Sequence, residues 1–336
     1  MIFSQQRLKK IIKRMQKVHI LVIGDVMLDR FVWGKVSRIS PEAPVPVVHV
    51  THDSSYPGGA ANVARNLADF RISTDIAGII GRDSGGRELQ KILHSCKIKG
   101  CMLQAESRFP TIVKTRVVAR QQQVVRVDRE ERLSLSAKKE KAFLSTIERQ
   151  IDKYDAIIVE DYGKGLLTQS LVESIISLSR DHKKILTADP NPNNPLQWTG
   201  ATLVKPNRLE AYSAAGMPLD ENLESLHKVG KILLRKWEIQ QLLVTLGEQG
   251  MVFFDKSGKT YYTPTRAREV FDVSGAGDTA IAFLTAGLAA GLKLEEAAEI
   301  ANYAAGVVVA KLGTATLKPE ELMNHISLQN KEVLTK

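Results

Sequence analysis

Five short apolar runs constrain the fold of this chain more than any other feature of its sequence. Each run is rich in β-branched residues and ends at a polar or glycine-containing turn. The runs are 19–23, 155–159, 184–188, 202–204 and 241–245. Strands that are apolar along their whole length are buried on both faces, as in a parallel sheet. Helical patterns stand between them, for example at 138–151 and 223–236. We therefore expect a three-layer α/β/α fold with a mostly parallel central sheet.

The polar residues that follow these runs give the first indication of function. Ligands of open α/β sheets bind outside the carboxyl ends of the strands, and polar or glycine residues follow every run. They are Gly24 and Asp25, Glu160 and Asp161, Asp189, Lys205 and Asn207, and Gly247. The same residue types also cap helices and form turns, so no single one of them identifies a site.

Two segments interrupt the alternation of strands and helices. Residues 31–51 contain three prolines among valines, and residues 111–128 alternate in places between apolar and basic or polar side chains. The second segment has the pattern of a hairpin with one solvated face. We expect both segments to form a small β-strand lid over the site, inserted in one domain that spans residues 1–336.

Charge and cysteine content limit the classes of function. The formal net charge is +10, but basic and aromatic residues do not interleave and no nucleic-acid motif is present. We therefore expect no nucleic-acid partner. No apolar run reaches the roughly 18 residues that span a bilayer, so we expect no membrane partner. Cys96 and Cys101 form neither a disulfide framework nor a zinc motif, which favours a cytoplasmic protein.

The N-terminal segment 7–17 is basic and carries apolar residues at helical spacing. These residues are Leu8, Ile11, Ile12 and Met15. A membrane-surface helix and a first helix packed on the domain both fit such a pattern. The spacing favours the packed helix.

The most specific motif is Asp-Val-Ser-Gly-Ala-Gly-Asp at 272–278, which precedes a helical run of small residues. Small residues at a helix N-terminus expose backbone N–H groups, and these groups together with the helix dipole favour an anion such as a phosphoryl group. Gly275, Ala276 and Gly277 would form that site, and Asp278 beside it would accept a proton from an attacking hydroxyl. A capping aspartate after a glycine turn is the structural alternative, but the complete motif favours catalysis.

A second motif, Gly58-Gly59-Ala-Ala-Asn62, opens another helical pattern. The double glycine permits close approach of a ligand to the backbone, and Asn62 could bind sugar hydroxyls, although a tight turn explains the glycines equally well. The chain has no GxxxxGK[ST] loop and no GxGxxG after its first run. These absences disfavour P-loop nucleotide binding and nicotinamide-dependent chemistry.

The motifs, and their order along the chain, resemble those of the ribokinase-like (PfkB) carbohydrate kinases. The segment 205–210 resembles the Mg-ATP motif of that family, 245–250 its nucleotide-side loop and 81–83 a further element. The resemblance runs from about 18 to 322. It implies a ribokinase-like fold, ATP and Mg²⁺ as cofactors, and a possible monovalent cation such as K⁺. It also implies a homodimer formed through the lid strands.

Within this family, several segments are similar to kinases of D-glycero-β-D-manno-heptose 7-phosphate. They are 24–30, 37–48, 161–165, 304–309 and 311–314. The similarity implies ATP-dependent phosphorylation of the anomeric C1 hydroxyl, which gives the 1,7-bisphosphate for ADP-heptose and lipopolysaccharide inner-core synthesis. Many such kinases carry a fused nucleotidyltransferase domain, whereas this sequence ends at Lys336 and resembles the stand-alone kinase. PfkB-type kinases of ribose, fructose or fructose phosphate are the nearest alternatives, and a non-catalytic sugar or nucleotide sensor is the alternative of another class.

The resemblance also implies roles for individual residues. The sugar would be bound by Asp25, Asp29, Gly58, Gly59, Asn62, Asp161 and Lys164, and its distal phosphate by Lys114, Arg116 and Arg120 of the lid. The nucleotide would be bound by Asn207, Glu210, Thr245, Gly247 and Asn302. Glu210 would hold Mg²⁺ through water, and Asp272 would lie near the monovalent cation.

Two positions depart from the family pattern. Asp-Phe-Arg-Ile stands at 69–72, where the family usually has an aliphatic residue followed by glycine. Glu160 stands before Asp161, where relatives often carry a small residue. An additional carboxylate at Glu160 would alter hydrogen bonding near the substrate.

Overall fold

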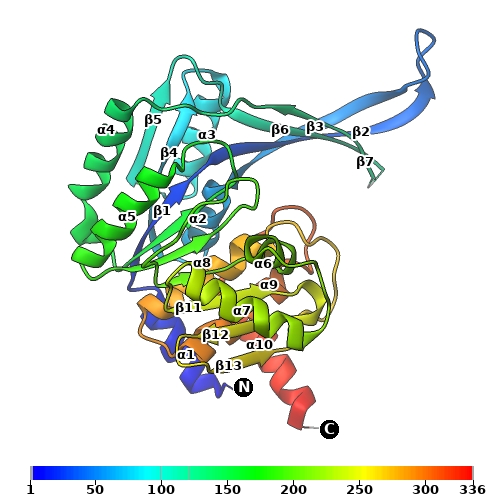
Figure 1. Cartoon of the computed structure of the whole chain (residues 1–336). Helices are drawn as coiled ribbons and strands as arrows, with labels where there is room; N and C mark the ends of the chain where they lie inside the picture. Colours follow the sequence, from blue (N-terminus) through cyan, green and yellow to red (C-terminus); the bar gives the residue numbers. More distant parts are fainter. Residues whose placement is uncertain (1–2, 99, 121, 335–336) are drawn as a thin grey trace.

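A nine-stranded sheet forms the middle layer of the molecule in a computed structural model that describes residues 3–98, 100–120 and 122–334 (Figure 1). Across the sheet, the strands are β13 (Thr260–Thr263), β12 (Met251–Asp255), β11 (Gln241–Thr245), β10 (Leu203–Val204), β9 (Ile185–Asp189), β8 (Ala156–Glu160), β1 (His19–Gly24), β4 (Ser73–Gly81) and β5 (Gly100–Glu106). Neighbouring strands are parallel from β11 to β5, whereas β12 and β13 are antiparallel. All five apolar runs lie in this sheet, so the predicted parallel sheet is confirmed.

Helices cover both faces of the sheet, because each buried strand is apolar on both sides. In β1, Ile20 and Val22 belong to one core, and Leu21 and Ile23 belong to the other. The first core is covered by α1 (Gln5–Met15), α2 (Ala60–Asp69), α3 (Ser84–Ser95), α8 (Ala276–Ala289), α9 (Leu294–Val308) and α10 (Pro319–Leu334). The second core is covered by α4 (Ala137–Glu148), α5 (Gln169–Asp181), α6 (Arg208–Ala215) and α7 (Leu223–Lys236). Short 3₁₀ turns are formed by η1 (Ile151–Lys153) and η2 (Gly247–Gln249). The predicted α/β/α layering is confirmed.

A second sheet projects from this body as a long arm (Figure 1). Its strands, in spatial order, are β3 (Pro46–Gly59), β2 (Val26–Ile39), β6 (Ile112–Ala119) and β7 (Gln122–Arg129). We call this four-stranded sheet the lid. It contains most of the two segments that broke the strand–helix alternation, and β2 and β3 extend beyond 31–51 until they reach β1 and α2. Gln121 of the predicted hairpin lies outside the described residues.

Helix α1 packs on the body. Its Leu8, Ile11, Ile12 and Met15 are buried, and the Ser4 side chain caps its start by accepting a hydrogen bond from the Arg7 N–H. The prediction of a packed amphipathic first helix is therefore confirmed.

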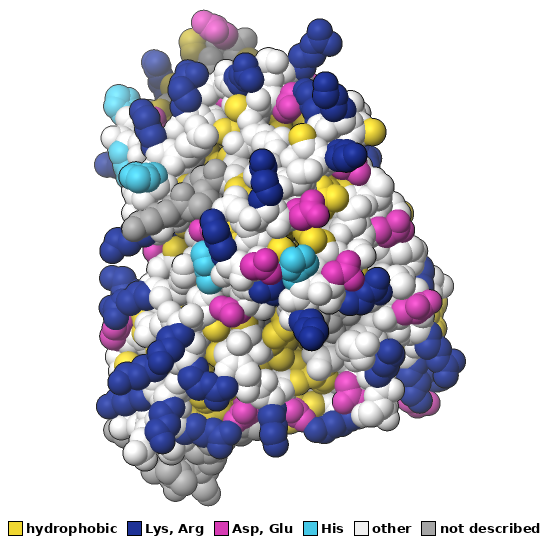
Figure 2. All heavy atoms as spheres, turned by 90° about the vertical axis from the view of Figure 1, so that its left-hand side faces the viewer, with side chains coloured by type: hydrophobic (Ala, Val, Ile, Leu, Met, Phe, Trp, Pro, Cys, Tyr) yellow, Lys and Arg dark blue, Asp and Glu magenta, His cyan; other side chains and the backbone are white. Residues whose placement is uncertain are grey.

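The surface is basic but mixed in charge. Figure 2 shows Lys and Arg side chains over the face that carries α4 and α5, with acidic side chains between them. Within the described part of the chain, none of the helices is long and apolar enough to cross a membrane.

Candidate active site

Charged side chains gather where the central parallel strands end. Asp25 directly follows β1, Glu160 is the last residue of β8, Asp189 is the last residue of β9, and Lys205 directly follows β10. All four are buried or half-buried. Because these strands are parallel, their carboxyl ends meet at one edge, which is where an α/β sheet binds its ligands.

Asp278 lies in the first turn of α8, close to this edge. Its Oδ2 accepts a hydrogen bond of 2.6 Å from the Asn62 side-chain amide, and its Oδ1 accepts one of 2.7 Å from the Tyr162 hydroxyl. Burial raises the pKa of the Asp278 carboxyl above its ordinary value, although both hydrogen bonds and the nearby Lys205 ammonium oppose that rise. The carboxylate is thus oriented by two donors and made more basic by its surroundings.

The chain enters α8 through a left-handed residue, Gly275, with φ of 79°. The Ala276 N–H donates to the Val273 carbonyl at 3.2 Å, so this amide is used within the loop. The N–H groups of Gly277 and Asp278 meet no acceptor among the described residues. These two amides point from a helix N-terminus, which suits an anion.

On the lid side, Asp29 pairs with Arg116. Asp29 is buried in β2, and Arg116 reaches it from the neighbouring strand β6. The Arg116 guanidinium also lies over the Phe31 ring, 5.4 Å from its centroid. A Cβ on Gly58 would lie 2.3 Å from Asp29 Oδ2, so the lack of a side chain at 58 makes room for this carboxylate.

Asp25, which the sequence assigns to sugar binding, contacts the backbone of the loop after β8. Its carboxylate accepts hydrogen bonds from the backbone N–H groups of Tyr162, Lys164 and Leu166, at 3.1, 2.9 and 3.3 Å. Both oxygens are thereby occupied by the loop after β8. Asp25 therefore holds this loop, and its sugar-binding role stays a prediction, because each carboxylate oxygen can accept more than one hydrogen bond.

Asp161 and Lys164 lie in the same loop. Asp161 accepts hydrogen bonds from the Gly163 N–H and the Asn194 amide, and burial raises its pKa to about 7. The Lys164 ammonium pairs with Glu130 at 2.7 Å. Both side chains therefore stand near the site, each with a partner inside the protein.

The three basic lid residues separate into two groups. Lys114 is half-buried beside Lys164, and burial together with that like charge lowers its pKa. Lys114 is the register partner of Asp29. Arg120 instead lies exposed in the turn after β6, six residues further along the chain, or about 20 Å in extended chain. Within one chain, Arg120 therefore lies well away from Asp29, whereas Lys114 lies beside it.

A pocket of 450 Å³ lies beside the α8 N-terminus. Its lining includes Thr245, Gly247, Gly277 and Asn302. The Asn302 amide is occupied by the 263–266 loop, since it donates to Thr263 and the Pro264 carbonyl and accepts from the Arg266 N–H. Asn302 thus shapes the wall of this pocket.

Asn207 and Glu210 form a capping box at the start of α6. The Asn207 side chain accepts from the Glu210 N–H at 2.9 Å, and Glu210 Oε2 accepts from the Asn207 N–H at 2.7 Å. Glu210 keeps its second carboxylate oxygen without a hydrogen bond from the described residues. No group of three or more His, Cys, Asp or Glu side chains in the described part of the chain could hold a metal ion alone. One carboxylate oxygen fits Mg²⁺ that is bound mainly through phosphates and water.

Asp272 accepts hydrogen bonds from the N–H groups of Ser274 and Gly313, at 2.9 and 3.0 Å. Burial disfavours its charge, but these bonds outweigh burial, and the pKa of Asp272 lies below its ordinary value. Asp272 therefore joins the loop before α8 to the segment after α9, and remains anionic.

Three residues of this site carried no assigned role in the sequence. Tyr162 donates to Asp278 across 116 positions of sequence, and Lys205 pairs with Asp189 at 2.8 Å. Asp189 and Lys205 both directly follow apolar runs, so the sequence had already placed them at the ends of predicted strands. Tyr162 lies in the similar segment 161–165, but its contact with Asp278 could not be predicted, because it depends on how the loop after β8 folds back.

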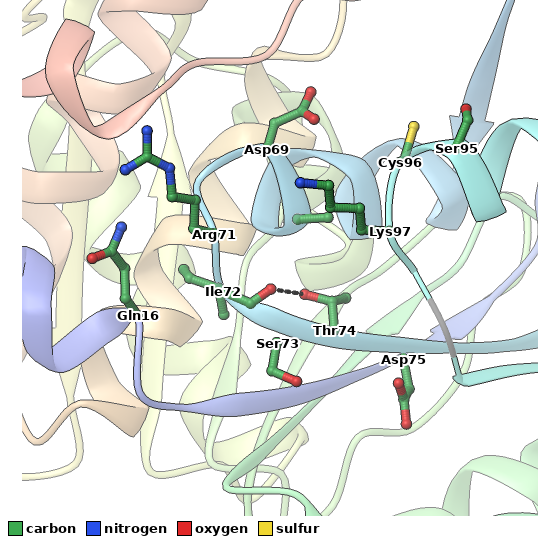
Figure 3. A pocket seen from close by; sticks show the side chains of 11 residues that line it. Gln16, Asp69, Arg71, Ile72, Ser73, Thr74, Asp75, Ser95, Cys96 and Lys97 are labelled. Carbon is green, nitrogen blue, oxygen red and sulfur yellow. Dashed lines mark hydrogen bonds between the residues drawn. The ribbon is translucent and has the colours of Figure 1, made fainter.

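A larger cavity of 550 Å³ lies at the opposite end of the sheet, beside the first residues of β4 (Figure 3). Asp69 and Arg71 point from its rim. Arg71 pairs with Glu320 at 3.0 Å, and Asp69 accepts a hydrogen bond from Thr316 at 2.5 Å. These two charges are paired within the protein.

Comparison with known proteins gives a consistent result. The model of the family described as "pfkB family carbohydrate kinase" matches residues 17–321. The chain is 39% identical over 329 residues to "Bifunctional protein HldE" of Pelobacter propionicus, covering 98% of this chain and 67% of the relative. It is 41% identical over 317 residues to the protein of the same name from Aliarcobacter butzleri, covering 94% of this chain and 66% of that relative. The chain spans about two thirds of the length of these relatives.

Solved structures share the fold at low identity. Phosphofructokinase-2 from Escherichia coli in complex with potassium aligns with a TM-score of 0.75 at 18% identity, covering 93% of this chain and 99% of that one. Arabidopsis thaliana ribokinase complexed with ribose and ATP aligns with a TM-score of 0.70 at 17% identity, covering 92% and 98%.

Proposed function

Since this chain belongs to the pfkB family of carbohydrate kinases, and is an ATP-dependent sugar kinase, we propose that its substrate is D-glycero-D-manno-heptose 7-phosphate. The enzyme would phosphorylate the anomeric C1 hydroxyl, and the product, the 1,7-bisphosphate, would serve ADP-heptose and lipopolysaccharide inner-core synthesis. The kinase chemistry is supported by the carboxylate of Asp278, held by Asn62 and Tyr162 at the start of α8. The choice of heptose 7-phosphate is supported by the 39% identity to the relative from Pelobacter propionicus over 98% of this chain. A base beside unpaired amides is the arrangement that phosphoryl transfer requires.

In the proposed reaction, Asp278 accepts the proton of the C1 hydroxyl. The oxygen attacks the γ-phosphorus, the bond between that phosphorus and the bridging oxygen breaks, and its electron pair leaves with ADP. Asn62 and Tyr162 fix the direction of the carboxylate. Its raised pKa brings it closer to the pH at which a general base is most effective.

The amides of Gly277 and Asp278 would receive the negative charge that spreads over the phosphoryl oxygens. Glu210 would hold Mg²⁺ through water, and the metal would neutralise phosphate charge when bound. The 450 Å³ pocket with Thr245, Gly247 and Asn302 would accept the nucleotide. We assign a monovalent cation such as K⁺ to the neighbourhood of Asp272.

The sugar is assigned to the lid side of Asp278. Asp29 and Asn62 would bind its hydroxyls, with Gly58 and Gly59 lining the same pocket. Asp161 and Lys164 would face it from the loop after β8. Lys114 and Arg116 would meet the distal phosphate, because a phosphate requires cationic donors. A closed lid would exclude water and so limit hydrolysis of ATP.

The kinase is proposed to act in the cytoplasm, where ATP is supplied, as a homodimer that forms through the lid. Strand β7 lies at the edge of the lid sheet and is exposed along its length. An edge strand of this kind presents unpaired backbone groups to a second chain.

The test is an ADP-release assay with heptose 7-phosphate, ribose, fructose and fructose 6-phosphate as acceptors. We expect the highest kcat/KM for heptose 7-phosphate, and a product whose second phosphate is bound to C1 in ³¹P spectra. Asp278→Asn keeps the shape of the side chain but removes the base. It should lower kcat by about 10²- to 10⁴-fold, with ATP affinity changed little.

The two parts of the proposal fail separately. A preference for an unphosphorylated sugar would refute the heptose assignment and leave the kinase chemistry intact. Near-normal kcat in Asp278→Asn would refute the role of the base. Tight sugar binding without turnover by the wild-type protein would favour a sensor.

A further inference from the structure

Part of the wall of the 450 Å³ pocket is a segment without regular secondary structure. Residues 264–267 follow β13 as coil, and Thr265 and Ala267 line the pocket. Coil segments are more mobile than the elements that they connect. A mobile wall has to be ordered each time a ligand binds, and this ordering costs affinity. The contacts that hold this segment are therefore important for what the pocket can bind.

Two glycines from different elements lie against the backbone of this segment. A Cβ on Gly250, directly after η2, would lie 2.6 Å from the Thr265 nitrogen. A Cβ on Gly306, in α9, would lie 2.7 Å from the Arg266 carbonyl oxygen. Side-chain carbons do not approach other atoms so closely, so both positions need glycine. The segment is thus packed directly against the backbone of its neighbours.

The Arg266 side chain anchors the segment to α9. Its guanidinium donates from Nε to Glu299 Oε2 at 3.1 Å and from a terminal nitrogen to Glu299 Oε1 at 3.2 Å. Only 1% of the Glu299 surface is exposed. The guanidinium also lies over the Tyr303 ring, 5.1 Å from its centroid. A planar cation held by a two-pronged contact and an aromatic face has little freedom to move.

The partners of Arg266 are themselves fixed. The Tyr261 hydroxyl of β13 donates to Glu299 Oε1 at 2.7 Å. Burial, together with this bond, raises the pKa of Tyr261 above its ordinary value, so the hydroxyl remains a donor. The Arg266 carbonyl accepts hydrogen bonds from His325 Nε2 at 2.8 Å and from the Gln329 amide at 2.6 Å, both in α10. One residue thus joins the wall to β13, α9 and α10.

Stability alone is a weak explanation for this ion pair. A buried pair of charges often gives no net stability over apolar side chains of similar volume. The pair does supply direction, because a guanidinium and a carboxylate meet in one geometry. That direction is transmitted to Thr265 and Ala267, the neighbours of Arg266 that line the pocket.

We propose that Arg266, fixed by Glu299, is a positioning residue of this kinase, which holds the segment 264–267 in the shape that receives the nucleotide. Arg266 acts through its two neighbours in the wall. A wall that is already ordered loses less conformational freedom when the nucleotide binds, so affinity is higher. The inference rests on the proposed assignment of this pocket to ATP.

The experiment compares Arg266→Met with the wild type. Calorimetric titration without sugar gives Kd for ATP, and steady-state kinetics give kcat and KM for the sugar. We expect Kd for ATP to rise about 5- to 20-fold, because the wall must be ordered on binding. At saturating ATP, kcat and the sugar KM should stay within about threefold of the wild type, since the α8 N-terminus and Asp278 are untouched.

The matched control is Arg7→Met, which removes an ion pair to Glu296 on the same helix, three positions before Glu299. Both variants should lower the melting temperature, but only Arg266→Met should weaken ATP binding. A Kd for ATP within threefold of the wild type in folded Arg266→Met would overturn the proposal.

A second variant separates positioning from folding. Arg266→Met with Glu299→Gln leaves no unpaired buried charge and keeps an acceptor for Tyr261. Its melting temperature should recover, whereas Kd for ATP should stay raised. Recovery of both would show that the pair only supports packing, and would also overturn the proposal.

The pocket assignment has its own test in Ala305→Phe, because Ala305 lines the pocket and a ring there would fill part of it. If Ala305→Phe binds ATP as the wild type does, the assignment of the pocket to ATP fails, and the inference fails with it. If Ala305→Phe weakens ATP binding and Arg266→Met does not, the inference alone fails.

Discussion

At the scale of single residues, the state of Asp278 is set by a few neighbours. Burial raises its pKa, whereas the hydrogen bonds from Asn62 and Tyr162 favour its charged form. Under the proposed function, these opposing effects raise the basicity of the carboxylate while the two hydrogen bonds keep favouring its charged form. Tyr162 itself is held in place because Asp25 binds its backbone N–H.

Tyr162→Phe should raise the pKa of Asp278, because it removes a hydrogen bond that favours the carboxylate. The base would then be deprotonated only at higher pH, so the acid limb of the kcat/KM profile should move to higher pH. At neutral pH we expect a loss of about 10- to 100-fold, the effect of a hydrogen bond to a charged group. The measurement is a pH–rate profile from pH 5 to 9.

The control is Tyr154→Phe, which removes a comparable bond of 2.8 Å to Asp75 at the other end of the sheet. Its profile should match the wild type. A loss in Tyr162→Phe that is equal at every pH would show that the hydroxyl does not tune the base.

At the scale of elements, three strands of the lid meet at one closely packed point near the candidate site. Gly58 of β3 lies against the Asp29 carboxylate of β2, and Arg116 of β6 completes the contact. Three strands therefore depend on one small volume. A single methyl group placed there would disturb all of them.

Gly58→Ala should place its Cβ within 2.3 Å of Asp29 Oδ2 and displace that carboxylate. We expect KM for the sugar to rise about tenfold or more and KM for ATP to change little. Overpacking of this kind costs about 1–3 kcal/mol of stability. Steady-state kinetics and thermal melting would measure both effects.

Gly258→Ala is the comparison, because a Cβ there meets nothing within 4 Å, although its φ of 87° adds strain of about 1–2 kcal/mol. It should lose stability but keep KM. If KM for the sugar is unchanged in Gly58→Ala, the carboxylate of Asp29 does not bind the sugar.

How far the sequence predicted these elements depends on the range of the interaction. Apolar runs indicate local burial, so the strands of the central sheet and the residues at their ends could be predicted from the sequence. The hydrogen-bonding partners of Asp25 could not be predicted from the sequence. They lie in a loop 137 to 141 positions further along the chain, and the path of that loop depends on the tertiary fold. Lys114 and Arg120 share one basic pattern, yet the direction of the lid arm separates them. Those assignments required tertiary geometry.

At the scale of the whole molecule, the lid leaves apolar side chains in solvent. Val125 and Val127 of β7 are 48% and 57% exposed. Two residues apart on a strand, they lie on the same face. Monomeric proteins rarely expose an apolar edge strand, because such a strand pairs readily with another chain.

Val127→Asp should shift the proposed dimer to the monomer, because it would bury a carboxylate without a partner. Sedimentation equilibrium over a range of concentrations would measure the shift. Leu219→Asp, at a site of 58% exposure in the loop between α6 and α7, should leave the assembly unchanged. A wild-type chain that sediments as a monomer at all concentrations would contradict the proposal.

The lid grows out of the central sheet with a single residue, Asp25, between β1 and β2. Its other root, Gly59, runs straight into α2, and the Ala60 N–H donates to the Asp25 carbonyl at 3.1 Å. The same Asp25 anchors the loop that carries Tyr162. The lid and the loop that carries Tyr162 therefore share one attachment point, Asp25. Under the proposed function, the strands that would cover the sugar and the hydroxyl that orients Asp278 depend on the same residue.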